Sequence, residues 1–264
     1  MAAPSAPVIG GVVLCQNSSR TLRDCLLSMA FVNRLVVVDS GSTDRSPEIA
    51  KEVGAEVLHH AWEGYAAQRN WAADAVGTDW VMFLDSDEVL SDGGGDEVRA
   101  LASGDVQGIS FPFITYIRGE RLLRGRFGEE RHLRAFRRGL RFAGDVHELL
   151  VVSPAQEARA THPIHHFTYR SLEHAVSKAN AYSTLLARAG VRRGYARSMS
   201  GFLMNYVIKG GWMDGRAGLD AHLIDLLADV LTTRKVDESR WGPNDTTSAT
   251  VASPTRSGNH DRSS

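Results

Sequence analysis

The sequence contains only two cysteines, Cys15 and Cys25, in 264 residues. Two cysteines cannot make the disulfide framework of a small secreted protein, and Cys15 lies within an apolar run, so a reduced cytosolic setting is the simplest expectation. Residues 1–7 are rich in Ala and Pro and have neither a basic region nor an apolar stretch, so we expect no signal peptide there. No uncharged segment is long enough to span a bilayer.

The chain also lacks an excess of either charge, since 30 Lys and Arg oppose 31 Asp and Glu and the net charge is −1. There is therefore no overall electrostatic case for a nucleic-acid partner. Hydrophobic residues make up 43% of the chain and charged residues 23%, which is ordinary for a globular protein with a substantial core. The length suits one large domain, or one domain with an appendage.

Three common enzyme motifs are missing. No Gly-x-Gly-x-x-Gly follows the first predicted strand, which argues against a dinucleotide-binding dehydrogenase. A P-loop is absent too: the glycine run at 93–95 follows no predicted strand and lacks the lysine, and we interpret it as a loose loop. The tandem His147-Glu148 begins a zinc-protease motif, but Val151 stands where that motif requires His.

The first part of the chain alternates between two kinds of pattern. Short apolar or β-branched runs predict strands at 8–15, 35–39, 55–58 and 80–84. Helical spacing predicts intervening helices at 22–29, 46–54 and 68–75. Ser46 is suited to cap the second of these helices, with Pro47 at its first position and Gly54 at its end. This alternation predicts an α/β fold with a mostly parallel sheet flanked by helices.

The fourth predicted strand runs directly into a cluster of acids, Asp85-Ser86-Asp87-Glu88. Because unpaired carboxylates are costly in a core, the acids are expected at the carboxyl end of the strand, where open α/β sheets place their ligands. On an extended backbone, Asp85 and Asp87 would share one side. Two such oxygen donors suit Mg²⁺ or Mn²⁺, which take further ligands from water and substrate phosphates. A helix cap or a solvated turn would explain the same acids without a metal.

Several short motifs follow one another along the chain. They are Val36-Val37-Val38-Asp39-Ser40-Gly41-Ser42-Thr43-Asp44, Gln68-Arg69-Asn70, Phe83-Leu84-Asp85-Ser86-Asp87-Glu88, Gly144-Asp145-Val146-His147-Glu148, His166-Phe167-Thr168-Tyr169 and Gly210-Gly211-Trp212-Met213-Asp214-Gly215-Arg216. In this order they resemble family 2 glycosyltransferases of the GT-A (nucleotide-diphospho-sugar transferase) fold, and within that family the lipopolysaccharide core β-glucosyltransferase branch. The resemblance extends from about Val8 to about Leu231. It implies a GT-A domain at 8–170, with a nucleotide-binding half at 8–110 and an acceptor half at 111–170, followed by a C-terminal helical region at 171–235.

The resemblance also implies a donor site. Asp39 would hold the base or ribose of a nucleotide sugar, and Arg69 would contact the nucleotide or its diphosphate. Without the resemblance, Asp39 is equally well a turn cap and Arg69 a solvated arginine on a helix. Asp87 would ligate the metal directly, and Asp85 would contact the ribose or the metal. His166 would complete the metal site or contact the diphosphate. The remaining donor-binding candidates are Cys15, Asn17 and Ser86.

The catalytic candidates are Glu148 and His147. When a nucleoside diphosphate leaves an anomeric carbon, negative charge develops on the leaving oxygen, and a divalent cation stabilises it. The acceptor hydroxyl attacks from the opposite face, where a carboxylate takes its proton. The resemblance implies that Glu148 is this base, that His147 orients it or contacts the donor, and that transfer inverts the anomeric centre. Without the motif, Glu148 would be read as a surface residue at a strand edge.

Residues 118–141 hold nine arginines against three glutamates. This stretch could grip phosphates of the donor or of an anionic acceptor, or form a solvated face against anionic lipid. Single-stranded nucleic acid is the weaker choice, because aromatic residues are not interleaved with the arginines. After residue 171, helical spacing predicts helices that pack on the sheet domain or lie at a membrane interface, and the polar tail at 236–264 is expected to be disordered.

We therefore expect an inverting, metal-dependent glycosyltransferase that moves a hexose from a nucleotide sugar to a hydroxyl group. We expect the nucleotide of the donor to be UDP, and the acceptor to be a glycan, a lipid-linked molecule or a small molecule. Its cofactor would be Mn²⁺ or Mg²⁺, and its location the cytoplasm, with peripheral contact at the inner face of the membrane as an option. A sugar nucleotidyltransferase would also use metal-binding aspartates, but the loop at 16–20 is a poor match to the Gly/Lys/Arg-rich loop it needs. A degenerate nucleotide-sugar-binding module is the alternative without catalysis, and the presence of Asp87 and Glu148 argues against it.

Overall fold

The computed structural model describes residues 6–128, 130–143, 149–150, 152–169 and 171–240. The elements of its first half are β1 (Ile9–Cys15), α1 (Leu22–Ser28), β2 (Arg34–Asp39), α2 (Ser46–Glu52), β3 (Glu56–His59), α3 (Tyr65–Val76), β4 (Trp80–Asp85), β5 (Glu88–Leu90), α4 (Gly94–Ala102) and β6 (Gly108–Ile117). Those of the second half are β7 (Glu120–Arg121), η1 (Gly125–Phe127), β8 (Arg131–Arg137), β9 (Phe142–Ala143), β10 (Leu149–Leu150), η2 (Pro154–Gln156), β11 (Glu157–Arg159), β12 (Ile164–Tyr169), α5 (Leu172–Arg188), α6 (Tyr195–Phe202), η3 (Leu203–Ile208), η4 (Gly211–Asp214) and α7 (Gly215–Arg240).

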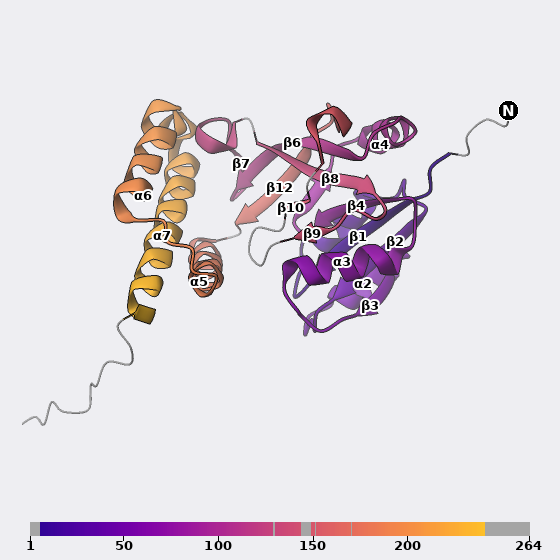
Figure 1. Cartoon of the computed structure of the whole chain (residues 1–264), viewed down its shortest axis with the longest axis horizontal. Helices are drawn as coiled ribbons and strands as arrows, with labels where there is room; N and C mark the ends of the chain where they lie inside the picture. The colour runs from indigo at the N-terminus through magenta and orange to yellow at the C-terminus, as the bar shows by residue number, and fades with distance from the viewer. Residues whose placement is uncertain (1–5, 129, 144–148, 151, 170, 241–264) are drawn as a thin grey trace, which may run out of the picture.

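One large sheet joins the two halves, in the strand order β3-β2-β1-β4-β8-β6-β12-β5. The first four strands are parallel neighbours, whereas β8 pairs antiparallel with both β4 and β6. Beyond it, β12 is parallel to β6, and the short β5 is antiparallel to β12. Figure 1 shows the parallel strands with α2 and α3 at one end of the molecule and helices α5–α7 at the other. The expected α/β sheet is thus confirmed, with antiparallel pairing entering where β8 is inserted.

Helices cover both faces of the parallel strands because successive strand residues point to opposite sides. On one face, Val13 and Val37 pack in a core with residues of α1, α2 and α4, including Leu26. On the other face, Val12 and Val36 pack in a core with residues of α3, chiefly alanines and Val76. The predicted strands at 8–15, 35–39, 55–58 and 80–84 correspond to β1, β2, β3 and β4, each within one residue at either end.

The glycine run at 93–95 is not the loose loop expected from the sequence. Only Gly93 lies outside a helix, with φ +81°, and Gly94 begins α4. A Cβ on Gly94 would lie 2.7 Å from the Leu90 side chain, and one on Gly95 would lie 2.6 Å from Phe31. The glycines therefore let the first turn of α4 pack closely on its neighbours.

The C-terminal helices form a compact group against the end of the sheet (Figure 1). Ala175 and Ala179 of α5 pack with Ile224 of α7, and Lys235 donates to the carbonyl of Asn180 at 2.8 Å. Because α7 continues to Arg240, residues 236–240 are helical, which corrects the expected start of the tail. Residues 241–264 lie outside the described part. Among the described helices, none combines the length and apolarity needed to cross a bilayer.

Glu97 of α4 fastens the segment that leads into β12. Its carboxylate accepts hydrogen bonds from the backbone N–H groups of Thr161 and His162, at 2.8 and 2.9 Å, and from the Thr161 hydroxyl. Burial opposes ionisation, but these hydrogen bonds outweigh it and lower the pKa of Glu97 to about 2. The contact matters for the site described below because β12 carries His166.

We predict that Glu97→Gln destabilises the protein by about 1–2 kcal/mol at neutral pH, because one carboxylate oxygen and its charge are lost. Since the pKa of Glu97 is lower in the folded state than its ordinary value of 4.5, the stabilisation is present above that value and is lost as pH falls toward 2. Thermal melts of wild type and variant should therefore converge at low pH, while the exposed Glu238→Gln control melts like wild type. An equal gap at pH 7 and at acidic pH would contradict this account.

Candidate functional site

The carboxyl ends of three adjacent strands meet at one edge of the sheet. Strands β1, β2 and β4 end at Cys15, Asp39 and Asp85. In register, Cys15 is paired with Asp39, and Leu14 with Asp85. The loops that follow these strands are therefore neighbours in space, as expected for the ligand-binding edge of an open α/β sheet.

These three loops are tied to one another by short polar side chains. Asn17 has φ 53°, its Oδ1 accepts from the N–H of Thr43 at 2.8 Å, and its own N–H donates to Ser42 Oγ at 2.9 Å. Ser86 Oγ donates to Ser18 Oγ at 2.7 Å, which joins the loop after β4 to the loop after β1. The loops thus form one connected cradle.

The cradle is completed by Asp44, which accepts from the backbone N–H groups of Ser19 and Ser46 at 3.0 Å each. Burial opposes its ionisation, but hydrogen bonds from Ser46 and Ser19 hold the pKa of Asp44 well below its usual range. Ser46 is the first residue of α2, so the cap expected from Ser46 is supplied by Asp44 instead.

The side chains of Asp39 and Cys15 are both buried. Asp39 is 2% exposed, and its carboxylate accepts from the N–H groups of Gly41 and Ser42 at 3.2 Å while His59 Nδ1 lies 3.3 Å away. This is the turn-capping role left open by the sequence. Cys15 belongs to the hydrophobic core, and burial raises the pKa of its thiol.

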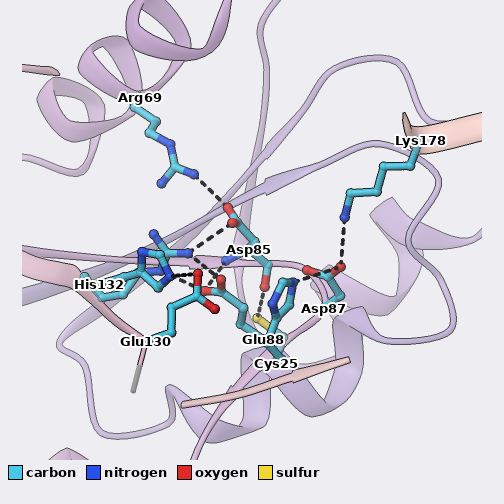
Figure 2. Close-up of polar contacts among 10 residues, drawn as sticks. Cys25, Arg69, Asp85, Asp87, Glu88, Glu130, His132 and Lys178 are labelled. Atoms are coloured by element: carbon cyan, nitrogen blue, oxygen red, sulfur yellow. Dashed lines mark hydrogen bonds and ion pairs between the residues drawn. The ribbon is translucent and has the colours of Figure 1, made fainter. Parts of the chain in front are cut away.

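The half-exposed carboxylate of Asp85 is paired with two arginines from distant parts of the chain. Arg69 of α3 donates to Asp85 Oδ1 at 2.8 Å (Figure 2). Arg134 of β8 donates to Oδ2 at 3.3 Å. Arg134 also pairs with the buried Glu88, whose Oε2 accepts from the Asp85 N–H at 3.1 Å. Burial works against the charge on Asp85, yet the two guanidinium groups hold its pKa well below its usual range. Burial raises the pKa of Glu88.

Asp87 has a different environment. It lies in the turn between β4 and β5, so the extended backbone assumed from the sequence is not present, and its carboxylate does not share the partners of Asp85. Asp87 Oδ2 lies 3.7 Å from His166 Nε2 and 3.7 Å from Lys178 Nζ. Burial opposes its charge, but His166 and Lys178 lower the pKa of Asp87. Figure 2 shows Arg69 and Lys178 reaching the acidic turn from opposite sides.

Asp87 and His166 are held together by backbone contacts. The N–H of Phe167 donates to the carbonyl of Asp87 at 2.9 Å, and β5 and β12 pair His166 with Glu88. Burial lowers the pKa of His166, but the hydrogen bond and charge of Asp87 outweigh it and raise the pKa above its ordinary value.

The donor atoms fit a divalent cation that relies on its substrate for ligands. No cluster of three His, Cys, Asp or Glu side chains suited to a metal occurs in the described part of the chain. Asp87 and His166 offer two donors, while both oxygens of Asp85 face arginines. Mg²⁺ and Mn²⁺ commonly use one or two protein ligands with water and phosphate oxygens, so two donors suffice only in the presence of a diphosphate.

The Gln68-Arg69-Asn70 motif connects three parts of the site. Gln68 is fully buried and donates to Ser40 Oγ at 3.1 Å, after β2. Asn70 exchanges two hydrogen bonds, both 2.9 Å, with the backbone of Phe142 in β9. Strand β9 leads directly into residues 144–148, so the catalytic candidates His147 and Glu148 lie outside the described residues.

Most of the arginine stretch serves the fold. Six of its nine arginines bind other groups of the protein within the described part. The pairs are Arg118 with Asp220, Arg126 with Asp225, Arg131 with the carbonyls of Ser110 and Ala160, Arg134 with Glu88 and Asp85, Arg137 with the carbonyls of Val106 and Gly104, and Arg141 with Asp74. The expected grip on external phosphates or lipid is therefore not the main use of these side chains.

A groove of about 680 Å³ runs from the acidic turn to the C-terminal helices. At one end it is lined by Asp85, Arg134, His166 and Lys178, and at the other by apolar and aromatic residues of α5–α7 such as Tyr182. We call it the sheet–helix groove. Its existence could not be read from the sequence, because its walls come from segments more than a hundred residues apart.

Comparisons with known proteins identify the family to which the chain belongs. The family model for glycosyl transferase family 2 matches residues 12–147. A lipopolysaccharide core biosynthesis glycosyltransferase of Rhizobium meliloti is 27% identical over 88% of this chain and 93% of its own. An uncharacterised glycosyltransferase of Rickettsia felis is 26% identical over 70% of this chain and 71% of its own.

One similar solved structure is glucosyl-3-phosphoglycerate synthase from Mycobacterium tuberculosis in complex with Mn²⁺, UDP and glucosyl-3-phosphoglycerate. Its sequence is 21% identical, and the match covers 70% of this chain and 81% of that one with a TM-score of 0.45. Residues 1–349 of TarS from S. aureus superimpose with TM-score 0.44 at 12% identity, covering 89% of this chain and 91% of that one. Since the family model spans more than half of the chain, the chain belongs to glycosyltransferase family 2 and has the GT-A fold.

Proposed function

We propose that this enzyme transfers a hexose with inversion from a nucleotide sugar, UDP-linked, to a hydroxyl acceptor, and that it depends on Mn²⁺ or Mg²⁺. The observation that carries the proposal is the contact between Asp87 and His166 at the carboxyl edge of the sheet, where the sheet–helix groove begins. A diphosphate seated there would meet two metal-binding side chains at the mouth of a cavity large enough for a second substrate.

The donor would lie over the cradle of loops. In the proposal, Asn17 and Ser86 contact the nucleoside from the cradle. Asp39, which is buried, positions the nucleoside by holding the loop after β2 through the N–H groups of Gly41 and Ser42. Arg69 acts through Asp85, which it pairs with at 2.8 Å, and Asp85 remains available to ribose hydroxyls while its charge is balanced. Cys15 would contribute through its backbone, since its side chain belongs to the core.

Asp87 and His166 would hold the cation. When bound, it would act as a Lewis acid that stabilises the charge developing on the departing diphosphate. Lys178 now lies 3.7 Å from Asp87, and its flexible ammonium can turn toward the diphosphate once the carboxylate is engaged elsewhere. In the proposal, Asp87 and His166 thus reach the phosphates through the cation, and Lys178 reaches them directly.

The acceptor would enter through the sheet–helix groove. Glu130 lies in the groove with its carboxylate 2.9 Å from His132 Nε2, and both can hydrogen-bond to hydroxyl groups of a glycan (Figure 2). The relative named for lipopolysaccharide core biosynthesis supports a cell-envelope glycan as the acceptor class. Glu148 is the proposed base that accepts the proton of the attacking hydroxyl, with His147 beside it.

A thermal-shift screen of nucleoside diphosphates and their sugars, with and without Mn²⁺, tests the proposal as a whole. Binding of a donor present at about a hundred times its Kd should stabilise the fold by about 2.7 kcal/mol. Release of free nucleoside diphosphate would separate an enzyme from a binding module. A nucleotidyltransferase would instead release pyrophosphate from a nucleoside triphosphate, and that product would contradict the proposal.

We predict that Asp87→Ala removes the Mn²⁺-dependent part of the donor-induced thermal shift, because one of two metal donors is lost. The exposed Asp92→Ala, which removes an equal charge nearby, is the matched control and should retain the full shift. If Asp87→Ala kept a Mn²⁺-dependent shift equal to wild type, Asp87 would not ligate the metal.

We also predict that Glu148→Gln binds donor like wild type but transfers sugar at least about 100-fold more slowly, as expected when a general base is removed. Release of nucleoside diphosphate in the presence of a core-glycan acceptor measures the rate, and the exposed Glu173→Gln is the control. Transfer at the wild-type rate would require another group as the base.

A further inference from the structure

The outer side of the C-terminal helices carries several exposed apolar side chains. Helix α6 and the π-helical stretch η3 form one unbroken helical segment, from Tyr195 to Ile208. We define the outer patch as six large apolar side chains of this segment and of η4, each between 48% and 72% exposed. They are Met199, Leu203, Met204, Val207, Ile208 and Trp212. Leu219 and Leu223 of α7 are exposed as well.

The inner side of the same segment is already occupied. Ser198 is buried, and Phe202 and Asn205 line the sheet–helix groove. Spacings of four residues, as between Met199 and Leu203, keep the outer patch on the side away from the groove. The inner side is therefore covered by the protein itself, whereas packing within the protein does not explain the outer patch.

The acidic residues around the outer patch differ from the basic ones in their contacts with the protein. Residues 195–230 contain four acids, and all four are bound within the protein. Asp214 accepts from the N–H groups of Leu123 and Arg124, and the other pairs are Asp220 with Arg118, Asp225 with Arg126 and Asp229 with Arg193. In contrast, Arg197, Lys209 and Arg216 are exposed, and no side-chain partner is recorded for them in the described part of the chain. The free charge beside the patch is positive.

We propose that the outer patch docks on the surface of an anionic lipid bilayer. Exposed aliphatic side chains with a tryptophan at their edge and unpaired basic residues around them are the features of an interfacial helix. Three acids of α7, Asp220, Asp225 and Asp229, would repel an anionic surface if they were free, but each is paired with an arginine. No described helix could span a bilayer, so the contact would be peripheral.

The docking would orient the sheet–helix groove. Because Phe202 and Asn205 line the groove from the inner side of the docking segment, the helical end of the groove would lie close to the lipid headgroups. Combined with the proposed transferase function, this orientation would let a lipid-anchored acceptor enter from the bilayer surface. The docking itself does not depend on that function.

Sedimentation of the full chain with vesicles tests the proposal. Wild type should pellet with vesicles of equal parts phosphatidylcholine and phosphatidylglycerol, more weakly at high salt, and far less with phosphatidylcholine alone. Leu203→Ser/Ile208→Ser should weaken pelleting at least about tenfold. Lys209→Glu/Arg216→Glu should weaken it on anionic vesicles. Val8→Ser/Leu27→Ser, which alters two exposed apolar residues outside the patch, is the matched control.

All variants should keep the wild-type melting temperature and the donor-induced thermal shift, which separates failure of docking from failure of the proposed function. Wild type that stays in the supernatant with anionic vesicles would overturn the proposal, as would double variants that pellet like wild type. A concentration-dependent dimer that Leu203→Ser/Ile208→Ser dissociates, without vesicle binding, would identify a second copy of the chain as the partner instead.

Discussion

The structure depends most on the ion pairs that hold the end of β4. Arg134 of β8 binds Asp85 and Glu88 at once, and Arg69 of α3 pairs with the other oxygen of Asp85. Glu88 is buried and Arg134 nearly so, and removal of either partner would leave an uncompensated buried charge, at a cost of about 3–5 kcal/mol. The Asp85 side chain is 40% exposed, so its own pairs contribute less. This network also joins the parallel strands to the antiparallel ones at the point where the ligand edge begins. The same contacts therefore set both the fold and the site.

Because of this network, the two aspartates of the Asp85-Ser86-Asp87 motif have different partners. Asp85 is fixed by two guanidinium groups, whereas Asp87 faces a histidine and a flexible lysine at 3.7 Å. Around the turn, three carboxylates are balanced by Arg69, Arg134 and Lys178, so the edge is close to neutral before any ligand binds. In the proposed function, a cation and a diphosphate that bound together would preserve this balance. Asp87 would then hold the cation in place of its contact with Lys178, and the pairs of Asp85 and Glu88 with the arginines would stay intact.

Local patterns in the sequence were sufficient for the elements that build this edge. The apolar runs of β1, β2 and β4 located the strands within one residue, and the acids after Leu84 located their carboxyl ends. The partners of those acids were not predictable, because Arg134 and Lys178 are brought to the turn by strand order and helix packing rather than by spacing. Arg134 was one of nine arginines with no local feature to distinguish it.

Two further differences from the sequence-based predictions come from contacts between segments. The glycines at 93–95 begin a helix because their missing side chains permit contact with Phe31 and Leu90, which no pattern of a single segment reveals. The helix at the C-terminus continues to Arg240 despite its polar composition, held in part by the contacts of Lys235 with α5. The signal that could have singled out Asn70 was its place beside Arg69 in a matched motif, although its role in holding β9 required the structure.

The most direct test of this account is the anomalous scattering of manganese in crystals soaked with Mn²⁺ and a UDP-sugar. The account predicts one manganese peak in contact with Asp87 and His166 and with the diphosphate, while Asp85 stays paired with Arg69 and Arg134. A peak coordinated by the Asp85 carboxylate, or a nucleotide bound away from the loops after β1, β2 and β4, would contradict it.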